Sequence, residues 1–333
     1  MKAAVLKEYN KKNLNLEIKD IPVPQPNDNE VLIKVMAAGV NPLDNMITRG
    51  EVKLIVPYKT PLVMGNELSG IVETVGKNVT QFQVGDKVYG RMPLGKIGAF
   101  AEYAAVNEKA LAKMPEYLSF EEGASVPLTA LTAQQALELM EPKKDETIFI
   151  SGGTGSLGAM AIPIAKAMGL KVITNGNGDN EDRARILGAD QFIDYKKQDY
   201  AAVISNVDYV LDTLGDRELP KEFTVLKDGG VLVSLRGLPN GEFAKRAGLS
   251  GIKQLMFGIV GRKYDKMARK RNQQYHFIFV HEDGKGLSKI NEMFSEIHLE
   301  PSVDTVYSLE EINKALSKVA GGKSKGKTVI KIE

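Results

Sequence analysis

Apolar and polar positions divide the chain into two regions of different texture. Residues 1 to about 120 hold short runs rich in β-branched residues, such as VLIKVMAAGV (31–40) and LSGIVETVG (68–76), with prolines and glycines between them. Helical spacing is scarce in this region. The pattern therefore predicts a compact, mostly antiparallel β domain.

From about residue 121 the pattern alternates between helix-like and strand-like segments, which indicates a doubly wound parallel sheet. Beyond residue 236 it loosens, although a last strand over 328–333 follows a Gly/Lys stretch and is placed to return to the N-terminal domain. The predicted helices are 119–140, 156–169, 179–190 and 284–297, and the predicted strands are 146–153, 171–176, 206–215, 228–235 and 275–280.

Composition narrows the class of protein. The 333 residues suffice for two domains of ordinary size, and 44 basic against 42 acidic residues argue against a dedicated nucleic-acid binder. Cysteine is absent, which excludes disulfides, thiol catalysis and Cys-ligated metals. The charged N-terminus lacks the apolar core of a signal peptide, and no apolar run is long enough for a membrane span, so we expect a cytoplasmic protein.

A glycine-rich loop lies between a predicted strand and a predicted helix. Gly153, Gly155 and Gly158 form a GxGxxG pattern around Thr154, Ser156 and Leu157. The first glycine permits a tight turn, the second lets the backbone approach a pyrophosphate, and the third lets helix and strand pack closely. The pattern predicts a dinucleotide site, and a plain glycine-rich turn is the alternative.

The end of the next strand bears on the choice of nucleotide. NAD-binding proteins usually carry an acid there, but this chain has Thr174-Asn175-Gly176, which leaves room for a 2′-phosphate. Arg183, Arg185 and Tyr195 follow closely and can supply positive charge and a hydroxyl. We therefore predict NADPH, although Asp179 and Asp182 weigh against it and both arginines have an alternative as solvated helix residues.

Several segments together resemble the medium-chain dehydrogenase/reductase superfamily, in its zinc-free quinone oxidoreductase branch, over nearly the whole chain. The resemblance implies a GroES-like substrate domain at 1–122, completed by about 300–333, and a Rossmann NADP-binding domain at 123–299, with the cofactor in the cleft between them. The segments, in family order, are AAGVNPLD (37–44), GNELSGIVETVGKNVTQFQVGDKVYG (65–90), VPLTALTAQQAL (126–137), SGGTGSLG, LGADQFIDY and VLDTLG.

The resemblance also extends the set of expected cofactor contacts. Thr132 is similar to the family's threonine at the nicotinamide end, whereas Asn180 stands where many relatives have a lysine. The expected cofactor contacts are Asn41, Thr132, Gly153, Thr154, Gly155, Ser156, Leu157, Gly158, Gly176, Asn177, Arg183, Tyr195, Leu214 and Phe277.

The chain departs from the zinc-dependent members of the superfamily at the metal ligands. By resemblance, Asn41 stands in a cysteine place and Asn66 in a histidine place, and neutral carboxamides are poor zinc ligands. The histidines, His276, His281 and His298, lie far away in sequence from both. We therefore predict no metal.

Without a metal, the plausible reaction is hydride transfer to an acceptor whose oxyanion is already stabilised, namely a quinone or an enone. The catalytic candidates are Asn41, Asp44 and Tyr275, with Tyr58 as a further donor. Each has a structural alternative: Asn41 as a turn residue before Pro42, Asp44 as a turn cap, and Tyr275 as a packed strand aromatic. Glu67 is read as a buried structural carboxylate.

Residues 243–271 hold nine basic residues against one acid, a net charge of +8, so the rest of the chain carries −6 of the overall +2. We expect a loop beside the cofactor crevice that covers the acceptor. A dimer element, or a surface for a membrane or nucleic acid, is the alternative. The function predicted is NADPH-dependent reduction of a small quinone or enone by a homodimer with no nucleic-acid partner, and the alternative is an NADPH-binding protein that acts by association.

Overall fold

The computed structural model describes residues 1–12, 14–322 and 326–333, and these form two compact units. Unit 1 comprises Met1–Leu131 and His281–Glu333, and unit 2 is Thr132–Val280. Unit 2 is thus a continuous insertion between two parts of unit 1.

The boundaries of the units lie at 131 and 281, where the sequence placed them at 122 and about 300. Helix α3 (Pro127–Met140) runs across the first boundary. Helix α11 (Gly284–Glu296) packs against strand β8 (Leu111–Lys113), and this packing assigns α11 to unit 1 rather than to the nucleotide-binding part of the chain.

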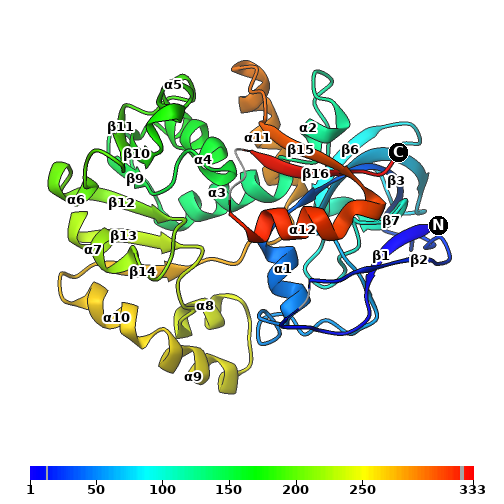
Figure 1. The fold of residues 1–333 in the computed structure, drawn as a ribbon, viewed down its shortest axis with the longest axis horizontal. Helices are drawn as coiled ribbons and strands as arrows, with labels where there is room; N and C mark the ends of the chain where they lie inside the picture. The colour runs from blue at the N-terminus through cyan, green and yellow to red at the C-terminus, as the bar shows by residue number, and fades with distance from the viewer. Residues whose placement is uncertain (13, 323–325) are drawn as a thin grey trace. The chain divides into compact units, whose positions relative to one another are not determined.

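Unit 2, every residue of which the structure describes, is built on a six-stranded sheet in the order β11-β10-β9-β12-β13-β14, with all neighbours parallel. The first three strands are added from β9 towards one edge of the sheet, and the last three are added from β12 towards the other edge. Because the two halves are added in opposite directions, their connecting helices cover both faces of the sheet (Figure 1). Ligands of such sheets bind where the order reverses, here beside β9. The strands are β9 (Thr147–Ile150), β10 (Lys171–Gly176), β11 (Gln191–Asp194), β12 (Val207–Asp212), β13 (Leu226–Ser234) and β14 (Gln274–Phe277).

The helices of unit 2 follow the predicted alternation, with two differences. The predicted helix over 179–190 is shorter and begins with a 3-10 turn, and the segment 243–271 is helical rather than a loop. That segment folds because Asn240 caps its first helix through Phe243 N–H (3.0 Å) and Phe243 packs edge-on against Phe257 and Phe277. The helices are α4 (Ser156–Ala167), η2 (Gly178–Asn180), α5 (Glu181–Ile186), α6 (Tyr200–Val203), α7 (Leu219–Val225), α8 (Gly241–Arg246), α9 (Gly251–Val260) and α10 (Arg262–Arg269).

Unit 1 is mostly antiparallel β structure, as predicted. In its described part, one sheet has the order β2-β1-β4, and a larger one has the order β15-β16-β3-β5-β6-β8 with β7 also paired to β3. The strands are β1 (Lys2–Leu6), β2 (Glu17–Asp20), β3 (Glu30–Val40), β4 (Leu62–Val63), β5 (Glu67–Val75), β6 (Lys87–Arg91), β7 (Tyr103–Asn107), β8, β15 (Val303–Ser308) and β16 (Lys327–Lys331). Its helices are α1 (Pro42–Arg49), η1 (Glu108–Ala110), α2 (Phe120–Gly123), α11, η3 (Leu309–Glu311) and α12 (Ile312–Ala320).

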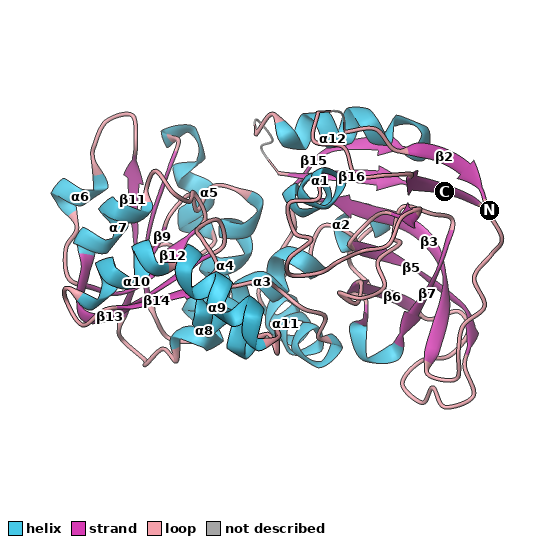
Figure 2. Cartoon of the chain, turned by 90° about the horizontal axis from the view of Figure 1, so that it is seen from below, coloured by secondary structure: helices cyan, strands magenta, loops and turns pink. Residues whose placement is uncertain are grey.

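The last strand of the chain completes the larger sheet of unit 1. β16 pairs antiparallel with β3, from Thr328 opposite Val40 to Lys331 opposite Ala37. The predicted return of the C-terminal strand to the N-terminal part is therefore confirmed. Figure 2 shows β16 between β15 and β3.

Candidate active site and cofactor loop

The glycine loop of unit 2 connects β9 to α4 and is held by the end of β10. The N–H of Gly152 donates to Asn175 Oδ1 (2.8 Å), and the N–H of Gly153 donates to the Asn175 carbonyl (3.1 Å). A Cβ on Gly153 would lie 1.9 Å from Thr174 Oγ1, and one on Gly158 would lie 2.3 Å from Gly153 Cα. Glycine at these two positions is required by packing within the protein.

Gly155 is different, because its side-chain position is open. A Cβ there would meet only the Gly152 carbonyl oxygen, at 3.4 Å, and its φ of −79° suits any residue. The space lies at the start of α4, whose first N–H groups are not used by the helix itself. A phosphate group fits such a position in both charge and size, so the residues present fit a dinucleotide.

The predicted nucleotide-specificity residues gather at the end of β10. The N–H of Tyr195 donates to the Gly176 carbonyl (3.2 Å), and a Cβ on Gly176 would lie 2.2 Å from Thr154. Asn177 lies in the same turn, where its side chain binds Asp179 (2.9 Å). The structure thus brings the glycine loop, the end of β10 and the start of the segment after β11 together.

The structure distinguishes the two arginines that the sequence named. Arg185 is paired with Glu181, with Nε and Oε1 2.9 Å apart. Arg183 is half-buried and has no acceptor among the described residues, and partial burial lowers its pKa. Of these two arginines, Arg183 is therefore the one available to a ligand.

The remaining cofactor candidates of unit 2 are spread over three elements. Leu214 follows β12 and is 42% exposed. Phe277 ends β14 and is buried edge-on against Phe243, with ring centroids 5.0 Å apart. Thr132 is buried within α3.

Tyr275 lies in the core of unit 2. Its hydroxyl donates to the Leu238 carbonyl (2.9 Å), its ring packs against Tyr264 at 5.1 Å, and burial raises its pKa well above the usual value. A packed, bonded hydroxyl with a raised pKa is a poor proton donor. The predicted catalytic role of Tyr275 therefore has no support in this placement, and the packing alternative explains it.

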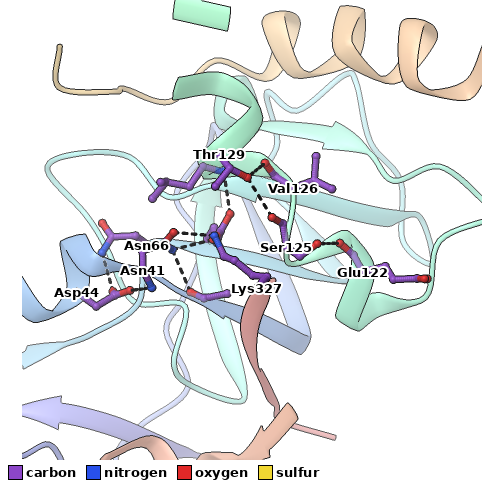
Figure 3. A network of polar contacts seen from close by, with 11 residues as sticks. Asn41, Asp44, Asn66, Glu122, Ser125, Val126, Thr129 and Lys327 are labelled. Atoms are coloured by element: carbon purple, nitrogen blue, oxygen red, sulfur yellow. Dashed lines mark hydrogen bonds and ion pairs between the residues drawn. The ribbon is translucent and has the colours of Figure 1, made fainter. Parts of the chain in front are cut away.

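In unit 1, a buried polar network surrounds Asn41, which directly follows β3 (Figure 3). Asn41 Nδ2 donates to Glu67 Oε1 (2.7 Å), and Asn41 Oδ1 accepts from Lys327 Nζ (2.6 Å). Lys327 Nζ also lies 2.5 Å from Glu67 Oε1, and Glu67 Oε2 accepts the N–H of Leu128 (2.7 Å). The side chain of Asn41 thus hydrogen-bonds to both members of the buried Lys327–Glu67 ion pair.

Asp44 and Asn66 extend this network. Asp44 accepts the N–H of Asn41 (2.7 Å) and the Nδ2 of Asn66 (2.7 Å), which makes it a cap of α1. Complete burial nevertheless raises its pKa to about 7; the two hydrogen bonds and Lys327 oppose the rise, and the charge of Glu67 adds to it. Asp44 is thus both the predicted cap and a group that titrates near neutral pH.

Arg91 is a charged residue of unit 1 that the sequence reasoning did not single out. It ends β6 with no exposed surface, and its Nε and Nη2 have no hydrogen-bond partner among the described residues. Nη1 donates to the Met92 carbonyl and lies 3.8 Å from Glu282 Oε2. Burial lowers the pKa of Arg91 and raises that of Tyr58 to about 12, an effect that the Arg91 charge opposes. The signal for a buried arginine that the sequence did contain is the position of Arg91 among the apolar residues of a strand.

A parallel sheet with an open glycine loop beside its reversal point, inserted into an antiparallel β unit, has the architecture of a dinucleotide-binding protein. Sequence comparison supplies the family. Residues 27–116 match the alcohol dehydrogenase GroES-like domain, and residues 187–330 match the zinc-binding dehydrogenase family. The chain belongs to the medium-chain dehydrogenase/reductase superfamily.

Individual relatives agree with this assignment. A quinone oxidoreductase of Homo sapiens is 33% identical, covering 70% of this chain and 74% of the relative. An NADPH-dependent alkenal/one oxidoreductase of Arabidopsis thaliana is 33% identical, covering 71% of this chain and 63% of the relative. A solved quinone oxidoreductase from Coxiella burnetii superposes with a TM-score of 0.84 at 28% identity, covering 100% of this chain and 99% of the other.

The zinc that the family name implies does not fit the residues present. Asn41 and Asn66 offer carboxamides, and both side-chain polar atoms of Asn41 are already engaged by Glu67 and Lys327. Among the described residues there is no group of three or more His, Asp or Glu side chains that could hold a metal ion. The cation bound at this point is the Lys327 ammonium.

Proposed function

We propose that this protein is an NADPH-dependent, zinc-independent oxidoreductase that transfers hydride to a quinone or an α,β-unsaturated carbonyl compound. The main support is that asparagines, Asn41 and Asn66, stand where the family's zinc-dependent members have metal ligands. The side chain of Asn41 is hydrogen-bonded to both members of the buried Lys327–Glu67 ion pair. The names of two relatives, a quinone oxidoreductase and an alkenal/one oxidoreductase, support the acceptor class.

The chemistry follows from that donor set. Oxidation of a simple alcohol needs a base or metal to activate the hydroxyl, whereas a quinone or enone forms a conjugated oxyanion of low energy. Bound NADPH would supply the hydride. The protein then has to bind both reactants, orient them and stabilise one oxygen.

This chain's own residues suit those tasks. The backbone around Gly155 and the start of α4 receive the pyrophosphate, and Arg183 receives the 2′-phosphate. In unit 1, Arg91 and Asp44 have no exposed surface, so they can position neighbouring groups but do not themselves contact the acceptor.

The acceptor class is tested by steady-state NADPH oxidation with a panel of quinones, enones, enals and saturated ketones, before and after chelation. We expect turnover of the first three classes, none of the saturated ketones, and no change on chelation. Loss of activity together with stoichiometric zinc would overturn zinc independence. Tight NADPH binding without turnover of any acceptor would favour action by association.

The cofactor preference is tested by calorimetry on Arg183→Ala, with Arg185→Ala as the matched control. A charged hydrogen bond contributes about 1.5–3 kcal/mol, so Arg183→Ala should weaken NADPH binding by roughly 10- to 100-fold and leave NADH unchanged. Arg185 is already paired with Glu181, so its loss should change neither affinity. Equal binding of NADH and NADPH by the unaltered protein would contradict the preference.

A further inference from the structure

Helix α9 presents its apolar residues to solvent. Ile252, Leu255 and Ile259 are 76%, 69% and 68% exposed, and Met256 and Val260 are each 44% exposed. The spacing of these five residues places them on one face of the helix, whereas Phe257 on the opposite face is buried against Phe243. A surface helix normally buries its apolar face, whereas α9 exposes its apolar face to solvent.

Helix α10 follows directly and presents positive charge. It is anchored by Tyr264 and Ala268, which are buried. Five basic residues are exposed on the outward face of α10, and none of the five has an ion-pair partner within the described chain. They are Arg262, Lys263, Lys266, Arg269 and, at the helix end, Lys270.

The two helices lie on the same outer side of unit 2. Only Gly261 separates them, and it is packed so closely on Asn240 that a Cβ would lie 2.4 Å from Asn240 Cβ. Figure 1 shows α9 and α10 in succession beyond β14, and Figure 2, from below, shows both in front of the parallel sheet. Five exposed or half-exposed apolar side chains and five exposed basic side chains thus lie on two adjoining helices, and we call the outward faces of these helices the α9–α10 surface.

The chemistry of the α9–α10 surface selects its partner. A second copy would bring one +8 segment against another, which is repulsive. A nucleic acid would match the cations but leave the apolar face in water. The surface of an anionic bilayer accommodates both, because lipid headgroups pair with the cations while the acyl boundary takes up the apolar side chains.

We propose that the α9–α10 surface docks this protein on the interface of an anionic lipid bilayer. The association is peripheral: no helix in the described ranges is long and apolar enough to cross a membrane. Lipophilic acceptors dissolve in the same bilayer, so docking would place the protein beside their reservoir. Docking itself does not require that the protein turn over any acceptor.

The test is sedimentation of the full-length protein with vesicles of phosphatidylcholine alone or mixed with phosphatidylglycerol. The protein should bind the mixed vesicles, more weakly at high salt, and not the zwitterionic ones. Each basic residue near an anionic surface contributes about 1 kcal/mol, so Lys263→Gln/Lys266→Gln/Lys270→Gln should weaken binding by at least about tenfold. Ile252→Ser/Leu255→Ser/Ile259→Ser should weaken it by a similar factor, and solvent-exposed substitutions there spare the fold.

Matched controls lie elsewhere on the chain. Lys59→Gln/Lys285→Gln/Lys289→Gln removes the same charge, and Val84→Ser/Ile297→Ser removes exposed apolar side chains of unit 1, so both should bind as the unaltered protein does. Equal loss in the controls would overturn the proposal. The proposal would also be overturned if the apolar triple variant changed from dimer to monomer in ultracentrifugation while its vesicle binding stayed unchanged. Binding of RNA that persists in that variant, together with no binding of the unaltered protein to vesicles, would likewise overturn it.

Discussion

Asn66 has a buried carboxamide oxygen without a partner in the described structure. The nitrogen of the same carboxamide binds Asp44, so Asn66 bears on how Asp44 is stabilised. Asp44 is fully buried and its pKa is raised to about 7, so it carries a proton over part of the physiological range. A protonated carboxyl needs an acceptor. A half-turn of the Asn66 carboxamide supplies one, because Oδ1 then takes the place of the nitrogen that now donates to Asp44.

This coupling predicts a pH dependence of stability. Between the ordinary pKa of 3.8 and about 7, the folded state retains a proton that the unfolded chain has released. Stability contributed by the neutral acid therefore falls as pH rises through this window, by up to about 1.4 kcal/mol per pH unit. Asp44→Asn should lose less stability across the window than the unaltered protein, as measured by urea unfolding at several pH values. An identical dependence in the two proteins would assign the effect to other groups.

At the residue scale, the sequence identified types of residue but not their surroundings. Arg183 and Arg185 were equivalent in the sequence, and only the pairing of Arg185 with Glu181 separates them. The sequence offers both catalysis and packing as roles for Tyr275, and its contacts with Tyr264 and Leu238 favour packing. Such distinctions depend on long-range contacts, which local pattern does not contain.

At the element scale, the glycine loop was predictable because its GxGxxG spacing lies between a strand-like and a helix-like segment. β10 coincides with the predicted strand 171–176, and α4 begins where the loop predicted a helix. The sequence did not predict the helices of 243–271, although the exposed apolar residues of α9 recur at helical spacing and the basic residues of α10 lie opposite its buried residues.

The loop yields a prediction about its second glycine. Gly155→Val should fold, because only the Gly152 oxygen lies within 4 Å of the added Cβ, and it should abolish NADPH binding by filling the phosphate position. Calorimetry gives the affinity and thermal unfolding checks the fold. Gly95→Val is the control, since nothing lies near its Cβ either, and it should change neither quantity. Unchanged affinity in Gly155→Val would make the loop a structural turn only.

At the scale of the whole molecule, Lys327 links the last strand to the N-terminal network. Its ammonium binds Asn41 and Glu67, both of which lie in the first part of the chain. The sequence predicted the return of the strand from its position and apolar pattern. It did not reveal the ion pair, because a lysine after a Gly/Lys stretch is usually solvated.

Removal of this cation should therefore be costly. Lys327→Met leaves a buried carboxylate unpaired, which destabilises by about 3–5 kcal/mol, whereas Lys331→Met on the same strand removes only an exposed pair with Glu121 and should cost less than about 1 kcal/mol. Urea unfolding measures both. Glu67→Gln in the Lys327→Met background should recover part of the loss. Equal effects of the two lysine substitutions would show that the buried pair contributes little.

The pairing of β16 with β3 also sets an order of events during synthesis. Unit 2 is a continuous segment, so all of it has left the ribosome while the final strand of unit 1 is still being translated. The edge of β3 that β16 covers stays open until then, and an open strand edge invites pairing with other chains. The nascent protein is therefore most vulnerable to aggregation just before β16 emerges, when the inserted unit is complete and the enclosing unit is not.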